Sequence, residues 1–408
     1  MSTTQVSEAG TIKQAAQDYW AKVKTGDIGP LAAILGLVVL CIVFGSMSPV
    51  FLTQGNFANL LTQAAAVIVI AMGLVFVLLI GEIDLSAGYA SGVCSAVLVI
   101  LVTKNDQPWY LALTASIIVG CVLGYLIGIL VARLGIPSFV VTLASFLAFQ
   151  GILLLLAGEG GTIRIEDKTV LAIENSNLSV SASWLFFIVV SAIYFLSGLA
   201  RINSRRKAGL KTELKKLWLI KTLALIGASG LAVLTLNLER SNNPDLVSLK
   251  GIPYVVPLIL AILVVGTFVL DRTAFGRHIY AVGGNAEAAR RAGINVKRIR
   301  IACFMICSAL SAIAGLIFAS RQNSVSPTTG GSSTLLYAVG AAVIGGTSLF
   351  GGKGKVRDAI LGGLVVAVID NGMGLLGYAA GIKFIVTGLV LLTSASVDAI
   401  SRRGVANS

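Results

Sequence analysis

Acidic and amide side chains interrupt long apolar stretches of this chain at two places. Glu82 and Asp84 lie in the segment GEIDLSAG, and Asp370 and Asn371 lie in the segment VIDNGMG. Ionisable groups are costly inside a bilayer, so each of them is a hypothesis for a substrate or ion path. Carboxylates there could carry protons, whereas amides and hydroxyls could hydrogen-bond a neutral solute. These residue types predict transport chemistry within a membrane.

Uncharged polar side chains in or beside other apolar stretches extend the candidate path. Hydroxyls and amides suit a polyhydroxyl solute, which needs paired donors and acceptors. Ser and Thr are also common packing residues between membrane helices, and that alternative stays open for each of them. The full set of candidate substrate-path residues is Asn59, Gln63, Glu82, Asp84, Ser86, Ser138, Thr142, Gln150, Thr347, Ser348 and Asn371.

The chain offers little for catalysis, metal binding or nucleotide binding. It has one histidine, His278, which lies beside the basic polar segment, so we expect no Ser/His/Asp or Cys/His catalytic arrangement. Its five cysteines lie in apolar stretches and are expected to be packing residues. In GGTSLFGGKGK the lysine comes one residue too late for a phosphate-binding loop, and a glycine follows it. We therefore expect no enzyme activity, no metal and no cofactor in this chain.

The elements that must position these residues are long apolar stretches. Of the 408 residues, 56% are hydrophobic and 12% are charged, and the mean hydropathy is +0.91. About 20 apolar residues span the hydrocarbon core as a helix, so we expect an all-α polytopic membrane protein with about twelve transmembrane helices. Their expected ranges are 30–50, 60–80, 86–103, 109–132, 137–157, 183–200, 218–238, 253–271, 301–320, 334–350, 357–377 and 383–399.

The basic residues set the expected orientation. Placing the N-terminus in the cytoplasm puts 24 Lys and Arg residues inside and 7 outside, as the positive-inside rule requires. The net charge of +13 is then expected to face anionic lipid and a cytoplasmic partner rather than nucleic acid. This orientation predicts a cytoplasmic N-terminal segment (1–29), one transmembrane domain (30–400) and a cytoplasmic tail (401–408).

A short polar segment, GNAEAARRAGINVKRIR, separates two of the apolar stretches. Asn285 is a good N-cap, and the charge of Glu287 favours the first turn of a helix. Arg290 and Arg291 follow toward its C-terminal end, and Gly293 can supply the left-handed residue that stops it. The pattern predicts a helix of about two turns that stands clear of the bilayer and docks to a soluble partner.

The spacing Glu287-Ala288-Ala289, three residues, then Gly293 resembles the EAA loop of ABC-importer permeases. The stretch from Arg277 through Ile299 is similar to the ribose/xylose/arabinose permease family, and so are GEIDLSAG and GGTSLFGGKG. The resemblance implies an ABC-importer permease fold with broken helices. It also implies a ten-helix core, to which this chain adds a helix pair (183–240) with a basic cytoplasmic linker (201–217), as in the xylose-type branch.

The resemblance assigns a role to the polar segment between the apolar stretches. It implies that a coupling loop (272–300) contacts an ATPase subunit, which would bind ATP and magnesium in place of this chain. The implied coupling residues are Asn285, Glu287, Ala288, Ala289, Arg290, Arg291 and Gly293. The further implied partners are a second permease copy, a periplasmic sugar-binding protein, a sugar and membrane lipid.

The predicted function is that of the membrane-spanning subunit of a bacterial inner-membrane sugar importer, with xylose the first candidate among the pentoses. One alternative is a proton-coupled secondary transporter, with Glu82, Asp84 or Asp370 as proton carriers. Another is an ABC permease for ribose, another sugar, a nucleoside or a branched-chain amino acid, because a fold does not determine its substrate.

Overall fold

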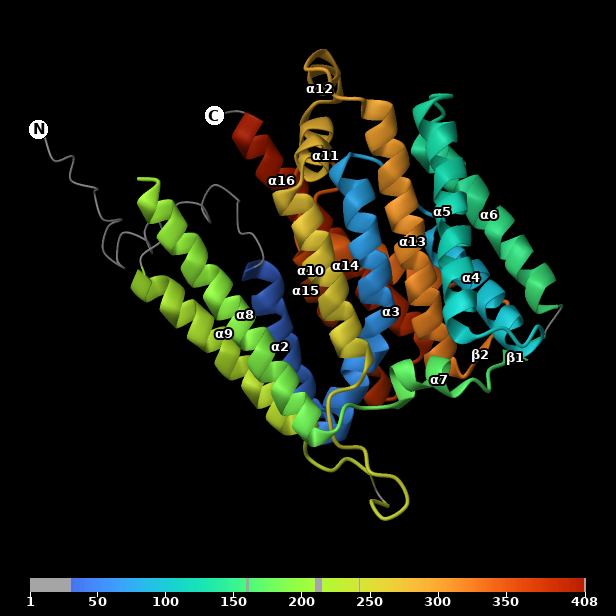
Figure 1. Ribbon diagram of the computed structural model, residues 1–408, viewed down its shortest axis with the longest axis vertical. Coiled ribbons are helices and arrows are strands. Elements are labelled where there is room, and N and C mark those ends of the chain that lie inside the picture. The colour runs from blue at the N-terminus through green and yellow to red at the C-terminus, as the bar shows by residue number, and fades with distance from the viewer. Residues whose placement is uncertain (1–30, 159–160, 210–214, 242, 407–408) are drawn as a thin grey trace, which may run out of the picture. The chain divides into compact units, whose positions relative to one another are not determined.

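The computed structural model describes the backbone of residues 31–158, 161–209, 215–241 and 243–406, and this part of the chain is almost entirely helical (Figure 1). Eight of its helices are long and apolar enough to cross a membrane, and four shorter apolar helices accompany them. The long ones are α3 (Gln54–Leu79), α5 (Trp109–Ala132), α6 (Ser138–Ala157), α8 (Val180–Lys207), α9 (Lys215–Leu236), α10 (Val255–Arg272), α13 (Val296–Gln322) and α15 (Val356–Leu375). The shorter ones are α2 (Leu31–Met47), α4 (Ala87–Thr103), α14 (Ser332–Ile344) and the apolar part, Ala380–Ser396, of α16 (Ala380–Ala406). The predicted all-α polytopic architecture is confirmed.

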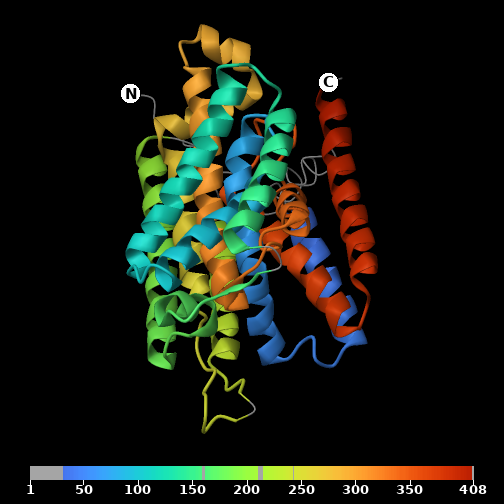
Figure 2. The ribbon, with the colours of Figure 1, turned by 90° about the vertical axis from the view of Figure 1, so that its right-hand side faces the viewer.

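The remaining described elements are short and lie at the ends of these helices. They are α7 (Lys168–Asn175), α11 (Ala274–Gly284), α12 (Ala286–Arg291) and the strands β1 (Ile163–Arg164) and β2 (Ser324–Val325). The two strands pair antiparallel, with Ile163 opposite Val325. Figure 2 shows α11 and α12 together at one end of the bundle.

Helix α3 is the core of the larger part of the molecule. It contacts α13, α15, α14 and α10, and 83% of the residues in its most apolar stretch are buried. Few of its residues are polar beyond the first turns, so its middle packs entirely through apolar side chains. A helix that is apolar on all sides belongs in the centre of a bundle rather than at a lipid boundary.

Glycines allow α5 and α13 to approach closely. Gly120, Gly124 and Gly128 recur at every fourth position, so they share one face of α5. A Cβ at Gly120 would lie 2.6 Å from the carbonyl oxygen of Ser308, and one at Gly124 would overlap the carbonyl oxygen of Phe304. Small residues at this spacing allow the close contact by which membrane helices associate without a hydrophobic driving force.

The described chain divides into two compact units. Residues 177–252, which contain α8 and α9, belong to one unit, and residues 31–176 and 253–399 belong to the other. The helix pair predicted at 183–240 falls within the first unit. Residues 201–207 of the predicted linker continue α8 as helix, whereas 210–214 and the N-terminal segment 1–29 lie outside the described residues.

Helix α14 ends earlier than predicted. The expected span 334–350 stops at Ile344, and the following residues to 355 form a loop. Gly346, Gly351 and Gly352 adopt φ values of +116°, +82° and +73°, which side chains rarely tolerate. The glycine-rich segment 345–355, which we call the glycine loop, therefore separates α14 from α15.

The orientation of α8 is open to a direct test. Ser204 is exposed near the end of this helix, among Arg205, Arg206 and Lys207. The positive-inside rule predicts that a Ser204→Cys variant reacts with impermeant thiol reagents only after the inner membrane face is opened. Equal labelling in intact cells would contradict the cytoplasmic assignment of the linker.

Candidate functional site

Three glycine-containing segments, which the sequence places far apart, meet at one point of the structure. Gly352 donates its backbone N–H to the carbonyl oxygen of Leu79 at 2.9 Å. A Cβ at Gly283 would overlap that same carbonyl oxygen, and one at Gly351 would lie 3.0 Å from the nitrogen of Gly81. Backbones can approach this closely only where side chains are absent. We call this contact of 79–81, Gly283 and 351–352 the glycine junction.

The helix that contains Gly283 leads directly into the predicted coupling helix. Thr273 caps α11 by accepting a hydrogen bond from the Gly276 N–H at 3.1 Å. Asn285 ends α11 and caps α12, accepting from the Ala288 N–H at 2.9 Å. A single residue, Asn285, therefore joins the two helices.

Gly293 ends α12 in the manner that the sequence predicts. Its φ is +85°, its N–H donates to Arg290 O, and the next N–H, that of Ile294, donates to Ala289 O, each at 3.0 Å. Both bonds satisfy carbonyls that the end of a helix leaves without partners. The predicted helix, its N-cap and its left-handed stop are confirmed. Its contact with an ATPase stays a prediction.

The charged side chains of α12 are directed outward. Glu287 is 2.8 Å from Arg290 and 3.2 Å from Arg291, and the three side chains are 51%, 71% and 80% exposed. Hydrogen bonds from these two arginines hold the pKa of Glu287 below its usual value. Ala289 is the residue of this helix that is buried. The exposed face therefore presents fixed charge of both signs to any partner.

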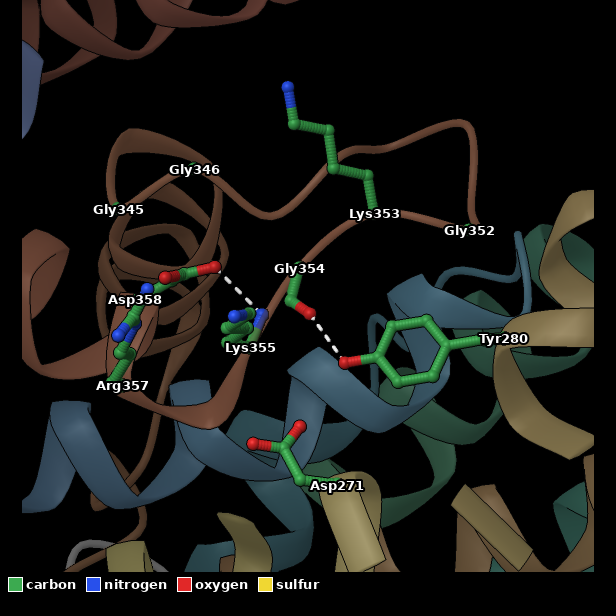
Figure 3. Close-up of a pocket in the computed structure, with 10 residues that line it drawn as sticks. All are labelled: Asp271, Tyr280, Gly345, Gly346, Gly352, Lys353, Gly354, Lys355, Arg357 and Asp358. Carbon is green, nitrogen blue, oxygen red and sulfur yellow. Dashed lines mark hydrogen bonds between the residues drawn. The ribbon is translucent and has the colours of Figure 1, made fainter. Parts of the chain in front are cut away.

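A cavity of about 360 Å³ lies between α11, the end of α10 and the glycine loop (Figure 3). The Tyr280 hydroxyl crosses to this loop and donates to the carbonyl oxygen of Gly354 at 2.8 Å. Burial raises the pKa of Tyr280 to about 12, and the charges of Asp271 and Asp358 add to the effect. Because the hydroxyl keeps its proton at neutral pH, the bond from α11 to the loop is constantly available.

The GEIDLSAG segment joins the same region through paired charges. Glu82 is 3.2 Å from Arg300, near the start of α13, and both side chains are largely buried. Asp84 is fully buried and accepts hydrogen bonds from Ser86, from the N–H at 2.9 Å and from the hydroxyl at 2.6 Å. The carboxylates of this segment therefore stabilise the turn between α3 and α4.

Three of the predicted path residues, Ser138, Thr142 and Ser348, bond backbone at this end of the molecule. The Ile83 N–H donates to the Ser138 hydroxyl, and the Thr142 hydroxyl donates to the Ile83 carbonyl, both at 3.3 Å. Thr347 and Ser348 are buried in the glycine loop, where the Ser348 hydroxyl accepts from the Phe350 N–H at 3.2 Å. Gln150 lies apart from them, exposed on α6.

The other predicted path residues lie toward the N-terminal end of α3, away from the glycine junction. The Gln63 amide donates to Asp370 at 2.6 Å. Asn371 exchanges two hydrogen bonds of 2.9 Å with Asn56 and makes a third, of 3.3 Å, to Gln63. Sequence reasoning did not include Asn56. Its position seven residues before Gln63, on the same face of α3, is the signal that could have found it.

Asn59 belongs to a neighbouring group at this end. Arg321 donates to the Thr62 hydroxyl at 2.7 Å and to the Asn59 amide oxygen at 3.1 Å, and it lies 4.0 Å from the buried Glu174. Burial raises the pKa of Glu174 to about 8, and the nearby charge of Arg321 limits the effect. Asn59 therefore helps to hold α13 and α7 to α3.

The match to known proteins agrees with this architecture. The model of the family described as "Branched-chain amino acid transport system / permease component" matches residues 56–395. The chain belongs to this permease family. The match covers the glycine junction, helix α12 and the polar residues near the N-terminal end of α3.

The permease also resembles curated proteins over most of its length. It is 37% identical over 355 residues to the xylose transport system permease protein XylH of Escherichia coli (strain K12), covering 86% of this chain and 87% of that protein. With XylH of Haemophilus influenzae it shares 32% identity, over 94% of this chain and 99% of the relative. With the ribose import permease protein RbsC of Escherichia coli (strain K12) it shares 27%, over 90% and 92%. No solved structure matches the permease. The resemblance seen in the sequence is confirmed.

Two adjacent glycines of α11 provide a matched test of the glycine junction. In Gly283→Ala the new methyl meets the Leu79 carbonyl and Gly352, whereas in Gly284→Ala it meets open space. Overpacking of this kind costs about 1–3 kcal/mol, so the Gly283→Ala permease should unfold at a lower temperature in detergent and lose transport. Equal thermal unfolding of the two variants would contradict the close contact.

Proposed function

We propose that this permease is the membrane subunit of an ATP-driven importer in the bacterial inner membrane, and that it carries a pentose, with xylose the first candidate. The observation that carries the proposal is its 37% identity to a xylose permease over 86% of the chain. Two copies would enclose the path, and a periplasmic sugar-binding protein would deliver the sugar. A separate ATPase subunit would bind ATP and magnesium.

The exposed helix α12 suits the role of ATPase contact. Its face carries Glu287, Arg290 and Arg291 in fixed positions, and fixed charges favour a complementary partner over others. Through Asn285 it continues into α11, which touches α3 at Leu79 and the glycine loop at Gly354. Movement of the ATPase would thus reach α3 and the break between α14 and α15 by direct backbone contact.

The polar residues of the path favour a neutral substrate. Recognition of a carboxylate or phosphate usually requires a cation that is free to pair with it. Lys383 pairs with Asp370, and Arg321 is held by Asn59, Thr62 and Glu174. The amides of Asn and Gln around them can donate and accept hydrogen bonds, as sugar hydroxyls need. A pentose meets these conditions better than an organic anion.

The orientation follows from the ATPase contact. ATP is a cytoplasmic fuel, so α12 would face the cytoplasm, and the charge distribution favours both termini on that side. The N-terminal end of α3 would then face the periplasm, with Gln63 on α3 and Asn371 on the neighbouring α15. Anionic lipid would surround the basic residues at the cytoplasmic end of α8.

Uptake by the reconstituted complex tests the substrate. We expect proteoliposomes that contain the permease, its ATPase and its sugar-binding protein to take up labelled xylose when ATP is supplied, and more of it than of ribose or leucine. Vesicles without the ATPase are the control. Uptake driven by a pH gradient in those vesicles would support a secondary transporter instead. Uptake of leucine alone would overturn the sugar but leave the ATP-driven importer.

A substitution at the end of α12 tests the coupling role. Gly293 has φ +85°, a conformation that strains a β-branched residue but that Asn tolerates. We expect Gly293→Val to reduce ATP-driven uptake about tenfold or more, the effect of losing about 1.4 kcal/mol of coupling energy, while the basal ATPase rate and the amount of protein in the membrane stay the same. Gly293→Asn is the matched control and should transport normally. Full uptake by Gly293→Val would show that α12 is not the coupling element.

A further inference from the structure

A cluster of polar side chains ties three helices together toward the end of the bundle opposite α12. Its members are Asn56 and Gln63 on α3, Asp370 and Asn371 on α15, and Lys383 on α16. We call it the outer polar cluster. The two oxygens of Asp370 have different partners, since Oδ2 accepts from Gln63 at 2.6 Å and Oδ1 lies 3.4 Å from the Lys383 ammonium.

The cluster has a buried part and an accessible part. Asn56 and Asn371 are buried and exchange two hydrogen bonds, so they form a firm contact between α3 and α15. The side chains of Asp370 and Lys383 are 26% and 21% exposed, so the protein encloses their ion pair only in part. Buried amide pairs are costly to break, whereas an accessible ion pair can exchange its partners for water. The accessible part is therefore the one that can open.

The ion pair gives α16 a polar contact with α15, beside the packing of α16 on α14 through Phe384 with Tyr337 and through Ser394 with the carbonyl oxygen of Val343. Gly374 leaves room for the lysine, because a Cβ there would lie 3.1 Å from the Lys383 ammonium. Most neighbouring side chains on α16 are exposed and apolar, including Ile382, Ile385 and Leu389. Apolar residues would hold a lipid-facing helix without the desolvation cost of a charge pair. A lysine at this position is thus better explained by a reversible contact than by packing.

The same two helices connect the outer polar cluster to the glycine junction. From Leu79 at the junction to Gln63 in the cluster is about 24 Å along α3, at 1.5 Å per residue. From the start of α15 to Asp370 is about 21 Å by the same rule. Helices α3 and α15 pack against each other and can tilt together. Helix α16 is not one of the segments described as meeting at the glycine junction, so a tilt of α3 and α15 relative to α16 would change the distance between Asp370 and Lys383.

We propose that Gln63, Asp370 and Lys383 form a releasable clamp that closes the periplasmic end of the sugar path. The clamp holds α16 against α3 and α15 while the junction is at rest. Movement of α11 at the glycine junction separates the ion pair and opens the path to the sugar-binding protein. This proposal rests on the proposed function for its direction of transport, but its mechanics are independent of which sugar is carried.

The clamp predicts that breaking the pair exposes the path behind it. Val67 lies one turn deeper than Gln63 on the same face of α3 and is half-buried, so Val67→Cys serves as a reporter for impermeant thiol reagents applied to intact cells. In this background we expect Lys383→Gln and Asp370→Asn each to speed labelling about fivefold or more. The exchanged pair, Asp370→Lys with Lys383→Asp, should restore the slow rate.

Two controls make the result specific. Lys250 and Glu239 form another ion pair, at 3.8 Å, on a loop of the other unit, and Lys250→Gln should leave the labelling of the reporter thiol unchanged. The chain without Val67→Cys measures the reaction of its native cysteines. Labelling that stays slow in both single variants, or stays fast in the exchanged pair, overturns the clamp. Pentose uptake by the unchanged chain is measured separately, so a wrong substrate would not be mistaken for a wrong clamp.

Discussion

The carbonyl oxygen of Leu79 is the point on which the arrangement at the α11–α12 end of the molecule depends. It accepts a hydrogen bond from Gly352 and lies against the α-carbon of Gly283, so three chain segments meet there without a side chain between them. Contacts between backbones are stiffer than contacts between side chains, which can change rotamer to absorb a displacement. The end of α3 is therefore held rigidly against α11.

Paired charges keep the segments around this contact in register. Glu82 pairs with Arg300 next to the junction, and Tyr280 bonds the glycine loop from α11. Of the carboxylates that could serve as proton carriers, Glu82 pairs with Arg300, and Asp370 contacts Gln63 and Lys383. Asp84 accepts hydrogen bonds from Ser86 through Oδ1 alone, and its Oδ2 is buried without a hydrogen-bond partner among the described residues. Their arrangement fits mechanical roles in an importer whose energy comes from ATP.

The predicted path residues separate into two groups with different physical roles. At the junction, Ser138 and Thr142 bond the backbone of Ile83, which is the common use of Ser and Thr in membrane proteins. At the other end, Gln63 and Asn371 belong to a network of side chains that includes a partly accessible ion pair. The second group joins side chains of three helices, α3, α15 and α16, whereas the first supports backbone within the coil segments near the junction.

The sequence by itself determined the helices and the local turns, because both follow from short-range chemistry. Long apolar runs had to become buried or lipid-facing helices, Asn285 had to cap α12, and Gly293 had to end it. The family followed from three motifs in order. The tertiary structure alone decided that Gly81, Gly283 and Gly351 meet, and that Asn56 pairs with Asn371 across 315 residues. Such contacts depend on how whole helices pack, and no local pattern of residue types contains that information.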